Sequence, residues 1–256
     1  MSNRRRFHDG AVRAGRSSSR DPDRAGGAAQ RDRRATAEGL EEAFDLLDDD
    51  DALWVGVVTG TERIFSAGTD IRERADLRMP RGGEYGIIRR KRVKPLIAAV
   101  EGYALGGGFE IALACDLIVA SRSAEFGLPE ARRGLVAASG ALFRAPRALP
   151  VNVARELLVT GRTLSAERAF ALGVVNEVAE PGQALAGALG MAGEVCEASP
   201  VAVRETLRAL DAQVSDADVR GWEVTADALG TVLASEDFRA GIEAFAQRRT
   251  PQWQGR

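Results

Sequence analysis

A glycine run that leads into a carboxylate is the part of the sequence best suited to chemistry. Residues 106–110 read Gly-Gly-Gly-Phe-Glu, inside the apolar stretch AAVEGYALGGGFEIALACDL. If Gly107 opens a helix, Glu110 lies in its first turn, where unpaired backbone N–H groups stabilise negative charge. Glycine also lets a ligand approach the backbone without a Cβ in the way. The stretch therefore offers an N–H donor and a carboxylate beside one small-molecule site, although a glutamate that only caps the helix fits it equally well.

Two other turns carry residues of the same kinds. The sequence IFSAGTDI (64–71) follows a predicted buried strand, where α/β proteins commonly place a binding loop. Ala67 and Gly68 are small enough to leave their backbone N–H groups accessible, whereas Asp70 is better interpreted as the N-cap of a following helix. The sequence AEFGLPE ends at Glu130. Taken alone, this stretch is typical of a surface turn.

The elements that must position these residues follow from hydrophobic patterning. Short apolar runs closed by turn residues predict buried strands, and apolar residues at helical spacing predict helices. Strand, helix and strand alternate through the middle of the chain, and helices dominate after residue 139, so the expected fold class is α/β with a helical C-terminal part. The predicted strands are 53–60, 95–102, 116–121 and 173–179. The predicted helices are 36–48, 107–114, 140–149, 151–161, 165–173, 183–198, 200–212, 217–234 and 236–248.

The amino-acid composition limits the kinds of catalytic and binding site that the chain can contain. The single histidine is His8, in an unpatterned segment, so Ser-His-Asp, Cys-His and histidine-rich metal sites are not expected, and acid–base chemistry must use carboxylates. A net charge of −2 gives no general attraction to nucleic acid or to a membrane surface. Cys115 and Cys196 lie in apolar runs and are expected to be reduced, which indicates a cytoplasmic protein. Charged residues interrupt the longest apolar stretch, 95–120, so no membrane span is expected.

The N-terminal segment differs from the rest. Residues 1–34 contain ten Arg and four Asp, many small residues and no helix or strand period, which predicts disorder. A basic arm for RNA is an alternative to an inert tail, but the irregular charge pattern gives it little support.

Taken together, the stretches FSAGTDI, AAVEGYALGGGFEIALACDL and AEFGLPEARRGL resemble, in this order, the crotonase or enoyl-CoA hydratase/isomerase family. The resemblance continues through LLVTGRTLSAERAFALGVVNEV (157–178) and the closing GIEAFAQRRTPQW. It implies a spiral of ββα units, with a core over 35–195 and a helical oligomerisation region over 196–256 that forms a homotrimer or a hexamer.

The same resemblance assigns roles to residues. The thioester carbonyl of an acyl-CoA substrate would lie between the backbone N–H groups of Ala67 and Gly107, an arrangement that stabilises an oxyanion. Glu110 would activate water and Glu130 would deliver a proton to the α-carbon. Other residues expected to contribute to substrate binding are Ser66, Gly68, Asp70, Gly106 and Arg248, the last near the adenosine phosphate of coenzyme A or simply exposed at a helix end.

Because both glutamates are present, the resemblance implies an enoyl-CoA hydratase of the fatty acid β-oxidation type, which needs no metal and no cofactor beyond the coenzyme A of its substrate. A Δ3-Δ2-enoyl-CoA isomerase, a carnitinyl-CoA dehydratase-like lyase and a catalytically weak acyl-CoA-binding or RNA-binding homologue are the alternatives.

Residues 1–34 depart from the family, which begins with strands and an Asn-Arg-Pro…Asn-Ala segment. A displaced reading frame would explain this: if Ala29–Arg33 were encoded by GCG CAA CGC GAT CGA, the neighbouring frame would read Arg-Asn-Ala-Ile-Asp. Sequencing the gene tests this hypothesis. Loss of the first strands would expose a sheet edge and weaken both stability and coenzyme A binding.

Overall fold

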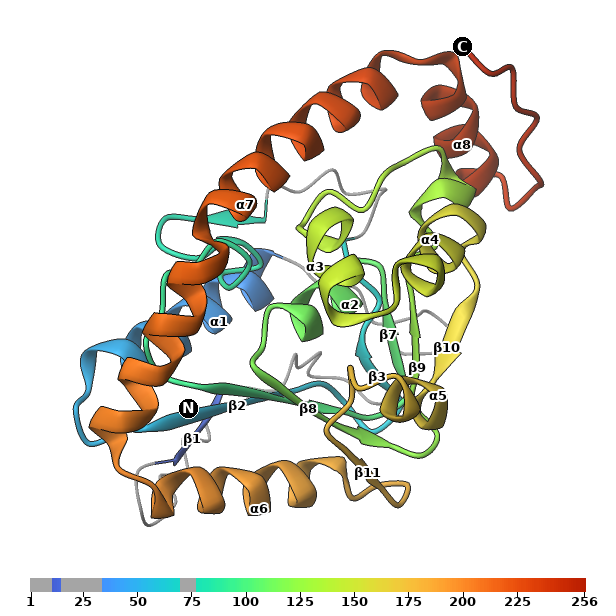
Figure 1. Cartoon of the computed structure of the whole chain (residues 1–256). Helices are drawn as coiled ribbons and strands as arrows, with labels where there is room; N and C mark the ends of the chain where they lie inside the picture. Colours follow the sequence, from blue (N-terminus) through green and yellow to red (C-terminus); the bar gives the residue numbers. More distant parts are fainter. Residues whose placement is uncertain (1–10, 15–33, 70–76) are drawn as a thin grey trace.

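The structure is a computed structural model that describes residues 11–14, 34–69 and 77–256 (Figure 1). Two sheets form its framework. The five-stranded sheet has the order β1-β2-β6-β8-β11, and every neighbouring pair in it is parallel. The four-stranded sheet has the order β10-β9-β7-β3, in which only the β10–β9 pair is antiparallel. The strands are β1 (Ala11–Ala14), β2 (Val55–Thr59), β3 (Ile64–Ser66), β4 (Arg78–Met79), β5 (Gly83–Glu84), β6 (Leu96–Val100), β7 (Tyr103–Leu105), β8 (Leu117–Ser121), β9 (Glu125–Gly127), β10 (Thr163–Ser165) and β11 (Glu177–Ala179).

Helices follow the strands and make up most of the second half of the chain. They are α1 (Arg34–Asp49), α2 (Gly107–Leu113), the short 3-10 helix η1 (Glu130–Arg133), α3 (Ala141–Ala148), α4 (Val151–Thr160), α5 (Ala166–Ala171), α6 (Ala184–Glu197), α7 (Pro200–Ala234) and α8 (Glu236–Ala246). The predicted α/β class, the helical C-terminal part and the three central strands are confirmed.

Three consecutive strand pairs build both sheets at once. In β2–β3, β6–β7 and β8–β9 the first strand joins the five-stranded sheet and the second joins the four-stranded sheet. The sharp turn between β6 and β7 needs Gly102, whose φ is +60° and where a Cβ would lie 1.8 Å from the carbonyl oxygen of Arg63. Helices α2 and η1 follow the second and third pairs, so the expected spiral of ββα units is confirmed.

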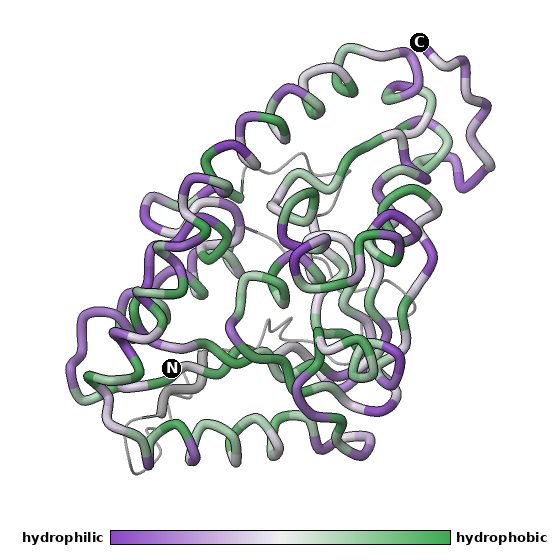
Figure 2. The backbone as a smooth tube through the Cα atoms, in the orientation of Figure 1, coloured by the Kyte–Doolittle hydropathy of each residue, from purple (hydrophilic) through white to green (hydrophobic). Residues whose placement is uncertain are grey.

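Both faces of the five-stranded sheet are covered, as its apolar strands require. On one face Val58, Ala98 and Val100 join a large core with α1 and α2. On the other face Val57 and Ile97 pack against α6, which lies across β2, β6 and β8 (Figures 1 and 2).

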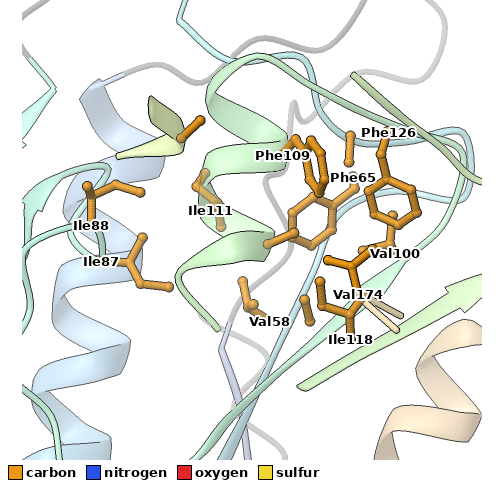
Figure 3. Packing of buried hydrophobic residues seen from close by; sticks show 14 of the residues in the cluster. Val58, Phe65, Ile87, Ile88, Val100, Phe109, Ile111, Ile118, Phe126 and Val174 are labelled. Carbon is orange, nitrogen blue, oxygen red and sulfur yellow. The ribbon is translucent and has the colours of Figure 1, made fainter. Parts of the chain in front are cut away.

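The large core continues beneath α2. Figure 3 shows the rings of Phe65, Phe109 and Phe126 gathered there, and the ring centroids of Phe109 and Phe126 lie 5.1 Å apart. Phe109 belongs to the first turn of α2, and its side chain is fully buried. This packing fixes the start of α2 against β3 and β9.

Several sequence expectations were wrong in detail. Residues 11–14 form β1, parallel to β2, although no strand period is visible between residues 1 and 34. An edge strand is defined by backbone pairing, so its side chains need not alternate. The turns around residues 64–66 and 125–127 are strands β3 and β9. The predicted strand 173–179 is limited to β11.

The two helices predicted over 200–212 and 217–234 are one continuous helix, α7, because residues 213–216 contain neither Gly nor Pro to end it. Helix α7 runs along one side of the molecule to α8, and its surface is mostly polar with scattered apolar residues (Figures 1 and 2). Within the described ranges, none of the helices combines the length and the apolar character that crossing a bilayer demands.

Candidate active site

The three glycines at 106–108 lie where several parts of the site meet. Gly106 has a φ of +57°, and a Cβ on it would lie 3.0 Å from Oε1 of Glu130. A Cβ on Gly108 would lie 2.1 Å from the carbonyl oxygen of Ser66. The absence of side chains at these positions therefore lets strand β3 and helix η1 approach the beginning of α2.

The same approach brings the two predicted amide donors into neighbouring segments. A Cβ on Gly68 would lie 2.8 Å from the backbone nitrogen of Gly107, so the loop that carries Ala67 passes directly beside that amide. The N–H of Gly68 donates to Oγ of Ser66 at 3.0 Å and is thus already used. Within the part of the chain that the structure describes, neither the N–H of Ala67 nor that of Gly107 donates a hydrogen bond. An external acceptor can therefore bind these amides without displacing a partner among the described residues.

Glu110 lies one turn into α2 and is 3% exposed. The N–H of Ala141, at the start of α3, donates to its Oε1 at 3.0 Å. Burial, and next the negative charge of Glu130, raise the pKa of Glu110 from 4.5 to about 8. A glutamate that served only as a helix cap would be ionised and hydrated, so this environment favours a proton-transfer role over a capping role.

Glu130 begins η1, directly after β9, and is partly buried. Its Oε2 atom is enclosed and has no hydrogen-bond partner among the described residues. Burial raises the pKa of Glu130 from 4.5 to about 7, against the opposing charge of Arg133. Two carboxyl groups with raised pKa values therefore meet at the glycine run, where one can hold a proton while the other is ionised.

Tyr85 joins this arrangement although its spacing in the sequence gives no sign of it. Its hydroxyl lies 2.7 Å from Oγ1 of Thr69, and a Cβ on Gly107 would lie 2.1 Å from the same hydroxyl oxygen. The backbone N–H of Ala141 is the second contributor that the sequence does not reveal, since a main-chain donor carries no residue signature. The glycines on both sides of Tyr85, Gly83 and Gly86, are a clue in the sequence to a tight turn there, and the structure gives both a positive φ.

The last two predicted binding residues are Asp70 and Arg248. Asp70 lies outside the described residues. Arg248 follows α8, is exposed and has a φ of +53°, and its N–H donates to the carbonyl oxygen of Phe245. Among residues 11–14, 34–69 and 77–256, no three His, Cys, Asp or Glu side chains are grouped so that they could hold a metal ion.

Comparisons with known proteins show the family to which the chain belongs. The family model described as enoyl-CoA hydratase/isomerase matches residues 33–256. A mevalonyl-coenzyme A hydratase of Aspergillus fumigatus is 39% identical over 236 residues, which cover 86% of this chain and 84% of that protein. A carnitinyl-CoA dehydratase of Salmonella heidelberg is 39% identical over 233 residues, covering 86% of this chain and 89% of that protein.

Solved structures show the same relationship. A carnitinyl-CoA dehydratase from Mycobacterium avium 104 superposes with a TM-score of 0.83 at 40% identity, covering 90% of this chain and 91% of that one. An enoyl-CoA hydratase from Mycobacterium tuberculosis H37Rv superposes with a TM-score of 0.69 at 43% identity, covering 90% of each chain.

Proposed function

The chain belongs to the enoyl-CoA hydratase/isomerase family and is a hydro-lyase of acyl-CoA thioesters, and we propose that it adds water to a 2-trans-enoyl-CoA to give a 3-hydroxyacyl-CoA and catalyses the reverse dehydration. The printed names of its relatives, a hydratase and a dehydratase, describe the two directions of such a reaction. The observation that carries the proposal is the meeting of two carboxyl groups with raised pKa values at a glycine run whose Gly107 amide has no acceptor among the described residues.

The amide pair holds the thioester in this proposal. The N–H groups of Ala67 and Gly107 donate to the carbonyl oxygen, which gains negative charge as the double bond is attacked. Each such donor contributes on the order of 3 kcal/mol to the stability of the transition state. Gly68 and Gly106 leave space for this contact, and Ser66 orients the loop through its hydrogen bond to the N–H of Gly68.

The carboxyl pair activates water and transfers the protons. The two coupled carboxyl groups share one proton, which must lie on Glu130 for this step although the pKa of Glu110, about 8, exceeds that of Glu130, about 7. In that form ionised Glu110 accepts a proton from water as the water oxygen bonds to the β-carbon, and the electron pair of the double bond moves toward the thioester. Protonated Glu130 then delivers its proton to the α-carbon, and the product is released as a 3-hydroxyacyl-CoA. One proton has been taken up and one given, so transfer between the two carboxyl groups restores the starting state. The proposed chemistry uses only proton transfers, with coenzyme A entering as part of the substrate.

Crotonyl-CoA hydration, followed by loss of the enoyl absorbance, tests this proposal. The wild-type chain is expected to turn over, and Glu110→Gln and Glu130→Gln are each expected to lower kcat by about 10²–10⁴-fold. A wild-type chain that hydrates no short or medium enoyl-CoA and dehydrates no 3-hydroxyacyl-CoA, including carnitinyl-CoA, would contradict it. Loss of activity in Glu110→Gln alone would instead indicate isomerase chemistry at the same site.

Assembly and coenzyme A binding complete the proposal. The chain forms a homotrimer or a dimer of trimers through α7 and α8, and exposed apolar side chains on α7 such as Leu210, Val219 and Leu233 support this interface. Arg248 contacts the adenosine phosphate of coenzyme A bound to a neighbouring subunit. Light scattering measures the assembly, and the KM of Arg248→Ala measures the contact. The setting is cytoplasmic, consistent with the reduced state of Cys115 and Cys196, neither of which is in a disulfide.

A further inference from the structure

The hydroxyl of Tyr85 lies at the boundary between the two amide-bearing segments. On one side it shares a hydrogen bond of 2.7 Å with Thr69, two residues after Ala67. On the other side a Cβ on Gly107 would lie 2.1 Å from the Tyr85 hydroxyl oxygen and 2.6 Å from its Cζ, so the tyrosine packs directly on the Gly107 backbone. Tyr85 is 5% exposed, and its ring is therefore held inside the protein.

The backbone around Tyr85 is fixed by α1. Tyr85 has a φ of +58°, a conformation that a non-glycine residue keeps only when its surroundings hold it. The carboxylate of Glu41, 8% exposed, accepts the N–H groups of Arg81 at 2.6 Å and Gly82 at 3.0 Å. A Cβ on Gly86 would lie 2.9 Å from the backbone nitrogen of Glu41, so the loop is pressed against the helix on both sides of Tyr85.

From these contacts we propose that Tyr85 is a positioning residue that sets the separation of the Ala67 and Gly107 amides through its hydrogen bond to Thr69 and its contact with Gly107. The inference deepens the proposed function and rests on it, because it assigns those amides to the thioester oxygen. Two donors help an oxyanion only when both reach the place it will occupy, and a displacement of about 1 Å can cost about 10²-fold in rate. Tyr85 supplies this rigidity without touching the reacting atoms.

Removal of one hydroxyl tests the role while the ring remains. Tyr85→Phe is expected to lower kcat by about 10-fold with little change in KM, and Thr69→Val is expected to do the same. The double variant should lose about 10-fold rather than about 100-fold, because both changes remove one hydrogen bond. Thr69→Ser keeps the hydroxyl and should restore wild-type turnover. Tyr103→Phe is the matched control, since Tyr103 is the other tyrosine of the chain and is 47% exposed.

A spectroscopic measurement separates positioning from simple loss of stability. Infrared difference spectra of bound butyryl-CoA, labelled with ¹³C at the thioester carbonyl, report the hydrogen bonds to that oxygen. Tyr85→Phe should reduce the shift of the carbonyl band relative to wild type, and Tyr103→Phe should not.

A wild-type kcat and a wild-type carbonyl band in Tyr85→Phe would overturn the role of Tyr85 while leaving the hydratase proposal intact if Glu110→Gln is inactive. A lower melting temperature with an unchanged carbonyl band would also overturn it. A wild-type chain without hydration activity would overturn the function instead, and the carbonyl band would still decide whether Tyr85 controls the two amides.

Discussion

The two halves of the candidate site, the carboxyl pair and the amide pair, are built on different principles. Glu110 and Glu130 depend on where their side chains are buried, because burial is the largest cause of both raised pKa values. The amides of Ala67 and Gly107 depend on the absence of side chains beside them, because Gly68 and Gly107 approach neighbouring atoms within distances that no Cβ would permit.

This difference predicts how each half responds to mutation. A carboxyl group can be replaced by an amide of the same shape, so its charge can be removed while its packing remains. A backbone donor cannot be removed in this way, and it can be disturbed only through the space around it. The carboxyl half is therefore expected to be sensitive to pH, and the amide half is expected to be sensitive to side-chain volume added next to the two backbone donors.

Gly107→Ala is expected to have the largest effect on the amide half. The new Cβ would lie 2.1 Å from the Tyr85 hydroxyl oxygen, so Tyr85 or the start of α2 must move. Because the amide pair then loses its alignment, kcat for crotonyl-CoA hydration should fall by about 10²–10³-fold, or about 3–4 kcal/mol of transition-state stabilisation.

Gly190→Ala is the matched control for this change. Gly190 lies in α6, and nothing lies within 4 Å of a Cβ built on it. Alanine there should leave kcat unchanged and raise the free energy of unfolding by about 0.5–1 kcal/mol, because glycine loses more backbone entropy in a helix. A Gly107→Ala protein with near wild-type kcat would show that the amide half tolerates added volume and would remove the contrast between the halves.

Glu110→Gln is expected to change the pH dependence of stability. The folded-state pKa of Glu110 is raised from 4.5 to about 8, so the stability associated with its proton is fully present below pH 4.5 and is lost as the pH rises through 8. Glutamine cannot ionise and avoids this loss. The variant should therefore gain on the order of 4 kcal/mol relative to wild type between pH 5 and pH 9.

Urea unfolding at a series of pH values measures this gain. Glu194→Gln, on the exposed surface of α6, is the control, and its effect should stay small because an exposed charge is hydrated in both states. A difference between Glu110→Gln and wild type that does not grow with pH would place Glu110 in a hydrated environment and contradict the division of the site.

The same division explains what could be predicted from the sequence. Glu110 is visible because a carboxylate directly after a glycine run is an unusual residue type at that position, whereas Glu130 lies in a stretch typical of a surface turn and is singled out only by the resemblance to the family. The buried strands β2, β6 and β8 are visible because both faces of each are apolar. In these cases the types of the side chains in the segment itself indicate that it is buried.

The remaining features depend on partners that are distant in the chain. Tyr85 contacts Thr69 and Gly107 only after two loops and a helix have folded together. Strand β1 is defined by its backbone pairing with β2. The three-residue strands are defined in the same way, because β7 pairs with both β3 and β9. Local periodicity cannot report such pairings, because the information lies in the partner rather than in the segment.

Ser66→Ala is expected to have the smallest effect and tests how finely the amide half is adjusted. The change removes the oxygen that accepts the N–H of Gly68 at 3.0 Å, in a buried loop next to Ala67. A buried donor left without this acceptor should lower the free energy of unfolding by about 1–2 kcal/mol. Because Tyr85 still holds the loop through Thr69, kcat should fall by less than about 10-fold. Ser235→Ala removes a bond of the same 3.0 Å length, from the N–H of Phe238 at the start of α8, together with the bond that the Ser235 hydroxyl donates to the carbonyl oxygen of Val232. It should reduce stability with no change in kcat. Equal losses of kcat in the two variants would mean that the loss follows general destabilisation, whereas a loss confined to Ser66→Ala would show that the loop carrying Ala67 controls the position of its amide.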